Sequence, residues 1–268
     1  MKNRRFLAST DLVAVLAATG ATTAAAKSLV ALSGNAKLLT IDYDHPRVLR
    51  QVSVSGIGLP LLGIDVRPAD RQLNGLVSDG SVVTINPANG QATFRVKLTQ
   101  TLPPGVRASV DFNPAADLLR VIGSDGTNFA GNVDTGAVTP GAALTFSAGP
   151  PPNPFGSVKP SVIAAAYTNS QAGAKGTFLF DIENTTDAIY LQFPPGAGTL
   201  TNVGAQLGIS LGSVAFDIAT DGRGVNFPWL INGNLLYRPG LLNGLVGRGT
   251  PIKGLNVPVR DLAVLPLS

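Results

Sequence analysis

A segment of the chain repeats itself after 46 positions, and this repeat constrains the fold more than any other feature. Shifted by 46, the residues around Asp65 overlay those around Asp111 without a gap. The identical positions in the first copy are Asp65, Pro68, Ala69, Leu73, Ser78, Asp79, Gly80, Asn86, Gly90 and Thr93. Because a period of about 40–50 residues is typical of propeller blades, the repeat predicts a β-propeller.

Each copy divides into four short apolar runs that are separated by turn residues. In the first copy we expect strands at Leu61–Arg67, Gln72–Val77, Ser81–Ile85 and Gln91–Leu98. Asp-Gly and Asn-Gly pairs between them favour tight hairpin turns. The direct copy spans Val106–Phe146. Looser units follow at Ser161–Gly204 and Ser213–Gly254, and the last of these becomes irregular around Asn226–Pro239.

The two ends of the repeat series complete each other. Ser28–Ser33, Lys37–Asp42 and Val48–Val54 are three predicted strands that lack a first strand, whereas Val259–Leu265 is a first strand with nothing after it. Joining them makes a fifth blade and leaves no free sheet edge at the ends. We therefore predict an all-β, five-bladed β-propeller closed by the C-terminal strand pairing with the N-terminal blade. The breaker-rich segment 149–156 is then a loop between blades.

The composition supports short strands and excludes several other classes. Charged residues make up 13% of the chain, 31 residues are Gly and 20 are Pro. A single Glu, Glu183, stands against fifteen Asp, and Asp favours turns where Glu favours helices. The absence of Cys excludes disulfides and thiol chemistry, and the only His, His45, lies in a polar turn. A metal site made of several histidines is thus excluded within one chain.

Residues 1–26 have the pattern of a secretory signal. Lys2, Arg4 and Arg5 precede a short apolar stretch, and small residues end it before Lys27. Asp11 interrupts the pattern, so a cleaved signal, a retained anchor and an untargeted tail all stay open. We expect an exported protein, at the periplasm, cell surface or outside the cell, with one propeller domain at 27–268. No transmembrane segment and no basic, aromatic nucleic-acid surface are expected.

Several segments resemble one known family. They include Leu61–Pro68, Thr84–Gly90, Asp111–Pro114, Ala165–Asn169, Phe216–Ile218 and Val259–Val264. Together they are similar to a bacterial secreted family known as domain of unknown function 4394, over roughly residues 28–266. The resemblance implies a secreted, propeller-like domain and implies no activity. Asn74, where an aromatic residue is common, departs from the family pattern.

Acidic side chains recur at one position of the innermost strands, which line the channel of a propeller. Asp65, Asp111 and Asp217 share that position, Tyr167 is read as its counterpart in the fourth blade, and Asp261 lies within two residues of it in the fifth. Carboxylates that converge from several blades suit a hard cation such as Ca²⁺. The structural alternative is that each Asp accepts backbone N–H groups of the next blade. Arg67, Arg120 and Arg260 are candidate internal counter-charges.

A second candidate site is the irregular segment that holds the only tryptophan. Trp229 is followed by Tyr237 and Arg238, and these three residue types often anchor interfaces. The alternative is that Trp229 fills space between blades. The turns Asp79-Gly80, Asp125-Gly126 and Asp221-Gly222 lack the spacing of calcium loops and are interpreted as hairpin turns.

These features favour an exported, non-catalytic binding or scaffolding domain for an unidentified protein or glycan partner, with no required cofactor and Ca²⁺ as the only candidate ion. The alternative is a hydrolase of the glycoside type that uses a carboxylate pair on the channel face. The geometry and pKa of the channel acids distinguish the two: a well-separated pair with one raised pKa favours the enzyme. Carboxylates bonded to backbone favour the binding domain.

Overall fold

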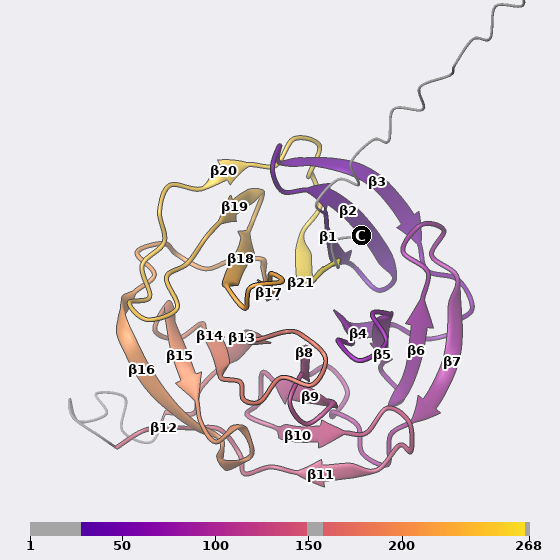
Figure 1. Cartoon of the computed structure of the whole chain (residues 1–268), viewed down its shortest axis with the longest axis horizontal. Coiled ribbons are helices and arrows are strands. Elements are labelled where there is room, and N and C mark those ends of the chain that lie inside the picture. The colour runs from indigo at the N-terminus through magenta and orange to yellow at the C-terminus, as the bar shows by residue number, and fades with distance from the viewer. Residues whose placement is uncertain (1–27, 149–157, 266–268) are drawn as a thin grey trace, which may run out of the picture.

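The protein is an all-β ring of five sheets in a computed structural model that describes residues 28–148 and 158–265 (Figure 1). The sheets follow one another around a central axis, with the first strand of each blade innermost (Figure 1). The five-bladed propeller that the repeat predicts is therefore confirmed. The predicted signal at 1–26 and the predicted loop at 149–156 lie outside the described residues.

The first sheet joins the two ends of the described chain in the order β21-β1-β2-β3. Its strands are β21 (Val259–Val264), β1 (Ser28–Ser33), β2 (Lys37–Asp42) and β3 (Arg47–Ser53). β21 and β1 are antiparallel, and their register runs from Leu29 opposite Val264 to Ser33 opposite Val259. This is the pairing on which the expected closure depends.

The second and third sheets are the two copies of the 46-residue repeat. The second holds β4 (Leu61–Val66), β5 (Leu73–Val77), β6 (Ser81–Ile85) and β7 (Ala92–Lys97). The third holds β8 (Ala108–Asn113), β9 (Leu118–Gly123), β10 (Asn128–Gly131) and β11 (Val138–Pro140). All neighbouring strands in both sheets are antiparallel, as hairpin-connected blades require.

The fourth sheet has five strands because the chain from the third blade runs along its outer edge. It holds β13 (Val162–Tyr167), β14 (Leu179–Glu183), β15 (Ala188–Gln192), β16 (Thr199–Gln206) and β12 (Thr145–Phe146), with the 3₁₀ turn η1 (Pro195–Ala197) before β16. Thr145 and Phe146 pair in parallel with Thr199 and Leu200. The direct copy of the repeat was predicted to extend to Phe146, and this is wrong. The third blade ends at β11, and Thr145 and Phe146 belong to the fourth sheet.

The fifth sheet corrects the expectation of irregularity at Asn226–Pro239. It holds β17 (Val214–Thr220), β18 (Asn226–Asn232), β19 (Leu235–Tyr237) and β20 (Thr250–Pro251). β17 and β18 pair without a bulge over their whole length, from Val214 opposite Asn232 to Thr220 opposite Asn226. The irregular part comes later, in the long connection between β19 and β20.

The hydrophobic core is divided among five clusters, each between two neighbouring sheets. Leu29 and Ala31 of the first sheet pack with Ala215 and Ile231 of the fifth, for example, and Leu32 packs against the second sheet. The remaining clusters join the second sheet to the third, the third to the fourth and the fourth to the fifth. Burial between blades thus runs around the whole ring and fixes the positions of the innermost strands.

Within the described residues there is no helix long and apolar enough to cross a lipid bilayer.

Candidate functional site

The innermost strands bring three carboxyl groups together on the axis of the ring. Asp65 of β4, Asp111 of β8 and Asp217 of β17 each offer an oxygen atom within 4.8 Å of the others. All three side chains are buried. The predicted convergence of carboxyl groups from three different blades is therefore present.

Each of these carboxyl groups accepts a backbone N–H group from the next blade. Asp65 accepts from Phe112 at 2.7 Å, Asp111 from Tyr167 at 3.1 Å and Asp217 from Val264 at 2.6 Å. Asp261 does the same with Ile64 at 2.7 Å. Four junctions between blades are thus held by an Asp side chain, which is the structural role weighed in the sequence.

Tyr167 is not the counterpart of the aspartates, and that prediction is wrong. Asp65 accepts the N–H group of Phe112, which is one residue after the equivalent position of the next blade, Asp111. Asp111 in turn accepts the N–H group of Tyr167. The equivalent position in the fourth blade is therefore one residue before Tyr167, at Ala166. The Tyr167 side chain lies in the core between the third and fourth blades, where its hydroxyl accepts a hydrogen bond from Arg120. A shift of one residue in a strand sends the side chain to the opposite face.

Asp261 lies two residues from the equivalent position, as expected, and it needs a glycine opposite. A Cβ atom at Gly63 would lie 2.5 Å from Oδ2 of Asp261 and 2.7 Å from Cγ2 of Val110. Only a residue without a side chain lets the second blade approach this carboxyl group. Asp261 is 1% exposed and, unlike Asp65 and Asp217, does not line the cavity described below.

Burial and mutual repulsion favour the protonated form of the acids on the axis. Burial, followed by the charge of Asp217, raises the pKa of Asp65 well above its usual value. Burial and then the charge of Asp65 do the same to the pKa of Asp111. Burial raises the pKa of Asp217 to about 6, while the backbone N–H groups of Val264 and Ile218 oppose the shift. Asp111 also lies within hydrogen-bonding reach of Asp217, so the pair can share a proton.

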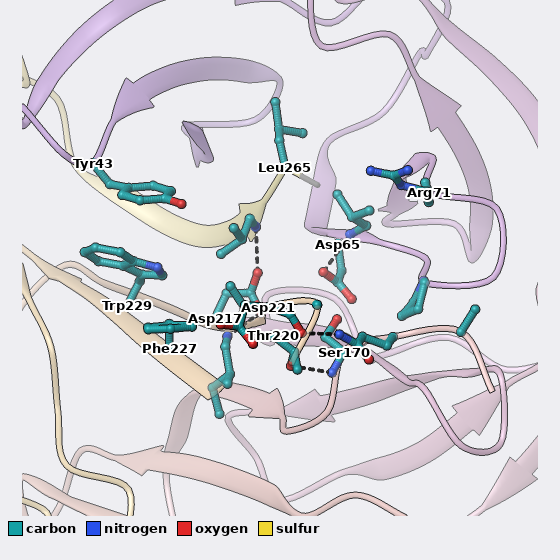
Figure 2. Close-up of a pocket in the computed structure, with 18 of the residues that line it drawn as sticks. Tyr43, Asp65, Arg71, Ser170, Asp217, Thr220, Asp221, Phe227, Trp229 and Leu265 are labelled. Carbon is teal, nitrogen blue, oxygen red and sulfur yellow. Dashed lines mark hydrogen bonds between the residues drawn. The ribbon is translucent and has the colours of Figure 1, made fainter. Parts of the chain in front are cut away.

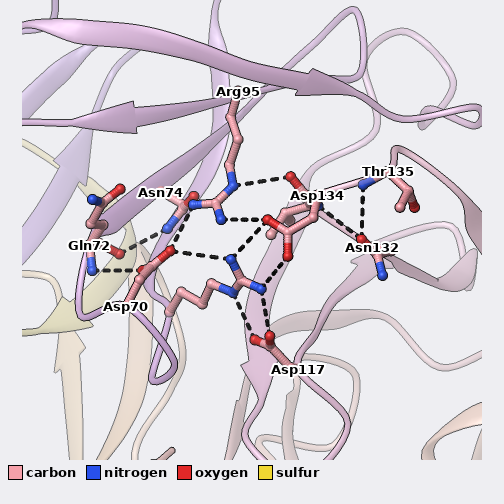
Figure 3. A network of polar contacts seen from close by, with 10 residues as sticks. Asp70, Gln72, Asn74, Arg95, Asp117, Asn132, Asp134 and Thr135 are labelled. Carbon is pink, nitrogen blue, oxygen red and sulfur yellow. Dashed lines mark hydrogen bonds and ion pairs between the residues drawn. The ribbon is translucent and has the colours of Figure 1, made fainter.

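The arginines expected to neutralise these acids have other partners. Arg67 bonds Asp117, Asp134 and Asp70, and Arg95 joins the same network between the second and third blades (Figure 3). These arginines lower the pKa of Asp134 to about 2. Arg120 bonds Tyr167 and Asn128, and Arg260 acts electrostatically on Asp261. Besides the backbone N–H groups that these carboxyl groups accept, a proton or a bound cation can relieve the repulsion in the trio.

A cavity of about 610 Å³ opens above this trio at the mouth of the channel (Figure 2). Asp65 and Asp217 belong to its lining, and Tyr43, Phe227 and Trp229 form an aromatic wall. The loops after β4, β13 and β17 also contribute to the rim, as do Asp44, Arg238, Val264 and Leu265. A concave site with a few polar groups among aromatic side chains is the usual form of a small-ligand site.

Trp229 is the centre of the aromatic wall. Its ring lies 4.4 Å from that of Tyr43, and the Arg238 guanidinium lies 3.9 Å from the ring centre of Trp229. The indole nitrogen is buried and has no hydrogen-bond partner in the described structure. Figure 2 shows this nitrogen on the edge of the ring that faces the interior of the pocket. A buried donor without a partner gains a hydrogen bond where a ligand brings an acceptor to it.

A second cavity, of about 430 Å³, lies against the same residues. Tyr43, Trp229 and Arg238 line both cavities, whereas Tyr237 lines only the second. Two of the channel acids, Asp65 and Asp217, and the group Trp229, Tyr237 and Arg238, which the sequence suggested as separate candidates, therefore meet at one end of the ring. Tyr43 was missed because its sequence context, a polar turn, gives no sign of the aromatic wall.

The Asp-Gly turns and His45 have the local roles expected of them. Asp79 and Asp125 each accept the backbone N–H group of the residue two positions later, and Asp221 accepts those of Arg223 and Val225. The side chain of His45 is 84% exposed.

Taken together, the fold and site define a five-bladed β-propeller with an acidic channel and an aromatic pocket at one mouth. The chain belongs to the family described as "Domain of unknown function (DUF4394)", whose sequence profile matches residues 37–263. The expected membership is thus confirmed. No curated protein matches the chain.

One solved structure from Bacteroides has a similar fold, and a second from the same genus is a weaker match. A protein of unknown function from Bacteroides thetaiotaomicron VPI-5482 is 18% identical, with a TM-score of 0.52 over 90% of this chain and 65% of that one. A protein of unknown function from Bacteroides caccae is 14% identical, with a TM-score of 0.44 over 84% of this chain and 73% of that one. At these identities the likeness concerns the fold alone.

Proposed function

We propose that this protein is an exported, non-catalytic binding propeller that holds its ligand in the pocket at the channel mouth. The observation that carries the proposal is the position of Asp65 and Asp217 beneath the aromatic wall of that pocket. Hydrogen-bonding groups at the base of a concave, partly aromatic site give a ligand both orientation and buried contact area.

The hydrogen bonds of the acids favour binding over catalysis. Asp65 and Asp217 each accept two backbone N–H groups, one from their own strand and one from the next blade. A general acid or nucleophile must exchange protons or bonds with the substrate, and these carboxyl groups are already engaged in holding the ring together.

The second candidate function remains a hydrolase of the glycoside type. The raised pKa of Asp217, about 6, is the observation that favours it, because a general acid must hold its proton near neutral pH. Oxygens of the trio lie within 4.8 Å of one another, which is closer to the short carboxyl separation of retaining enzymes, about 5–5.5 Å, than to the wider one of inverting enzymes. Glycan cleavage by the purified protein that disappears in Asp217→Asn would establish this alternative.

We also propose export and closure of the ring. The charged and then apolar pattern of residues 1–26 supports a signal, and a mature protein that begins at Lys27 would be the direct result of cleavage. The register of β21 with β1 supports closure by the C-terminal strand.

Capture from the extracytoplasmic fraction of the native organism tests the binding function. Ala172 lines the pocket and is exposed, so Ala172→Phe should fill the site without removing a buried contact. Ala115, an exposed turn residue of another blade, provides the control Ala115→Phe. We expect the wild type and the control to retain the same ligand and Ala172→Phe to lose it. Equal retention by all three proteins would refute the pocket as the binding site.

A further inference from the structure

We infer that the pocket at the channel mouth and the cavity beside it together bind a neutral oligosaccharide chain. This inference rests on the proposed binding function and adds the chemical class of the ligand. Three independent features support it: the shape of the site, its hydrogen-bonding groups and its balance of charge.

The shape of the site fits an elongated ligand. The two cavities, of about 610 and 430 Å³, share Tyr43, Asp44, Trp229 and Arg238 as lining residues. The stack formed by Tyr43, Trp229 and Arg238 is thus a partition with open space on both sides. A ligand that contacts both sides has to be long enough to pass over the edge of the stack, as a chain of several sugar units is, whereas a single small molecule would fill only one side.

The hydrogen-bonding groups require a ligand that both donates and accepts. The indole nitrogen of Trp229 is a donor without a partner, although the side chain is only 5% exposed. Asp65 and Asp217 are acceptors when ionised and also donors when protonated. A hydroxyl group supplies one donor and two acceptor lone pairs, so a polyhydroxylated chain can satisfy all of these groups at once.

The charges around the site favour a ligand without net charge. The charged residues that line the two cavities are Asp44, Asp65, Asp217, Asp221, Arg71, Arg223, Arg238 and Arg248. Four are acidic and four are basic, so even with Asp65 protonated the lining offers no large excess of either sign to an ionic ligand. Arg223 also forms an ion pair with Asp221, in which Nε of Arg223 lies 3.5 Å from Oδ2 of Asp221.

The only tryptophan of the protein allows this inference to be tested without labels in the site. Trp229 lines both cavities and is the single source of indole signals. The probes are neutral hexasaccharides, namely β-1,4-glucan, β-1,4-xylan, β-1,4-mannan and α-1,4-glucan. The comparison probes are hexagalacturonate, trilysine and tetra-alanine. The readouts are the indole ¹⁵N–¹H resonance, which moves when the N–H group gains an acceptor, and calorimetric affinity.

We expect at least one neutral hexasaccharide to move the indole resonance saturably. Trp229→Phe keeps an aromatic ring in the stack but removes the N–H group, and it should weaken binding about tenfold, the usual effect of one hydrogen bond. Phe94→Leu, at an exposed position of β7, is the control and should bind like the wild type. The wild-type resonance tests the inference even if Trp229→Phe does not fold.

Three results would overturn the inference, and they separate it from the proposed function. If only a charged or peptide probe moves the resonance, the ligand class is wrong but the pocket remains a binding site. Calorimetric binding of a hexasaccharide without movement of the resonance places the sugar elsewhere. If neither the probes nor a native extracytoplasmic extract moves the resonance, the proposed function fails as well.

Discussion

The acids on the axis should make this protein less stable as the pH rises, which is the reverse of the usual behaviour of carboxylates. Asp217 has a pKa of about 6 in the folded protein against 3.8 ordinarily. Because the folded state binds this proton more tightly than the unfolded chain, the contribution is complete below pH 3.8 and is lost as the pH rises through 6. Roughly two pKa units correspond to about 3 kcal/mol.

The raised pKa values of Asp65 and Asp111 act in the same direction. Asp134 acts in the opposite direction, since its pKa of about 2 gives stability that is lost as the pH falls below 3.8. The free energy of unfolding should therefore be greatest near pH 4 and should fall as the pH rises above it. In thermal melts with a chelator present, the melting temperature should fall by about 6–12 °C between pH 4.5 and 8 for a domain of this size.

Asp111→Asn should reduce this fall, because it removes one of the buried acids whose pKa is raised. The amide oxygen can still accept the N–H group of Tyr167, and its NH₂ group can donate to Asp217 in place of the shared proton. The variant should melt above the wild type at pH 8 and close to it at pH 4.5. Asp125→Asn, at an exposed turn, should follow the wild type at both values. A wild-type melting temperature that is flat or rises from pH 4.5 to 8, or a less stable Asp111→Asn at pH 8, would refute the reasoning.

Three further perturbations probe the ring. Ca²⁺ should raise the melting temperature modestly, and this rise should be absent in Asp111→Asn; a melt that is indifferent to both Ca²⁺ and chelator would leave the acids a structural role only. Deletion of residues 258–268 removes β21 and should destabilise the whole ring, so a truncated protein that melts at the wild-type temperature would contradict closure by this strand. Gly63→Ala, which places a Cβ atom 2.5 Å from Asp261, should cost about 1–3 kcal/mol in urea unfolding, whereas Gly58→Ala, with open space around it, should not.

Much of the fold could be predicted because a repeat exposes equivalent positions. The bounds of β1, β2 and β6 agree with the expected strands, since turn residues mark their ends. The path of β12 could not be predicted. A two-residue strand at the outer edge of another blade has no periodicity, and its partner Thr199 is remote in the sequence.

The candidate site was predictable only in part, for a related reason. Asp65 and Asp111 occupy equivalent places in the repeat, so their convergence follows from ring symmetry. Tyr167 was misplaced by one residue because the fourth blade has no recognisable copy of the motif. The pocket wall comes from loops and strands of different blades, and nothing local to Tyr43 indicates that it packs on Trp229.

Emission from Trp229 gives the most direct test of the central claim, that the channel mouth is a binding site. The small-molecule fraction of the native extracytoplasmic extract would be titrated into the wild type, Ala172→Phe and Ala115→Phe while tryptophan fluorescence is recorded. We predict a saturable change in the wild type and in Ala115→Phe, and none in Ala172→Phe, where the pocket is filled. No change in any protein, or the same change in all three, would contradict the account.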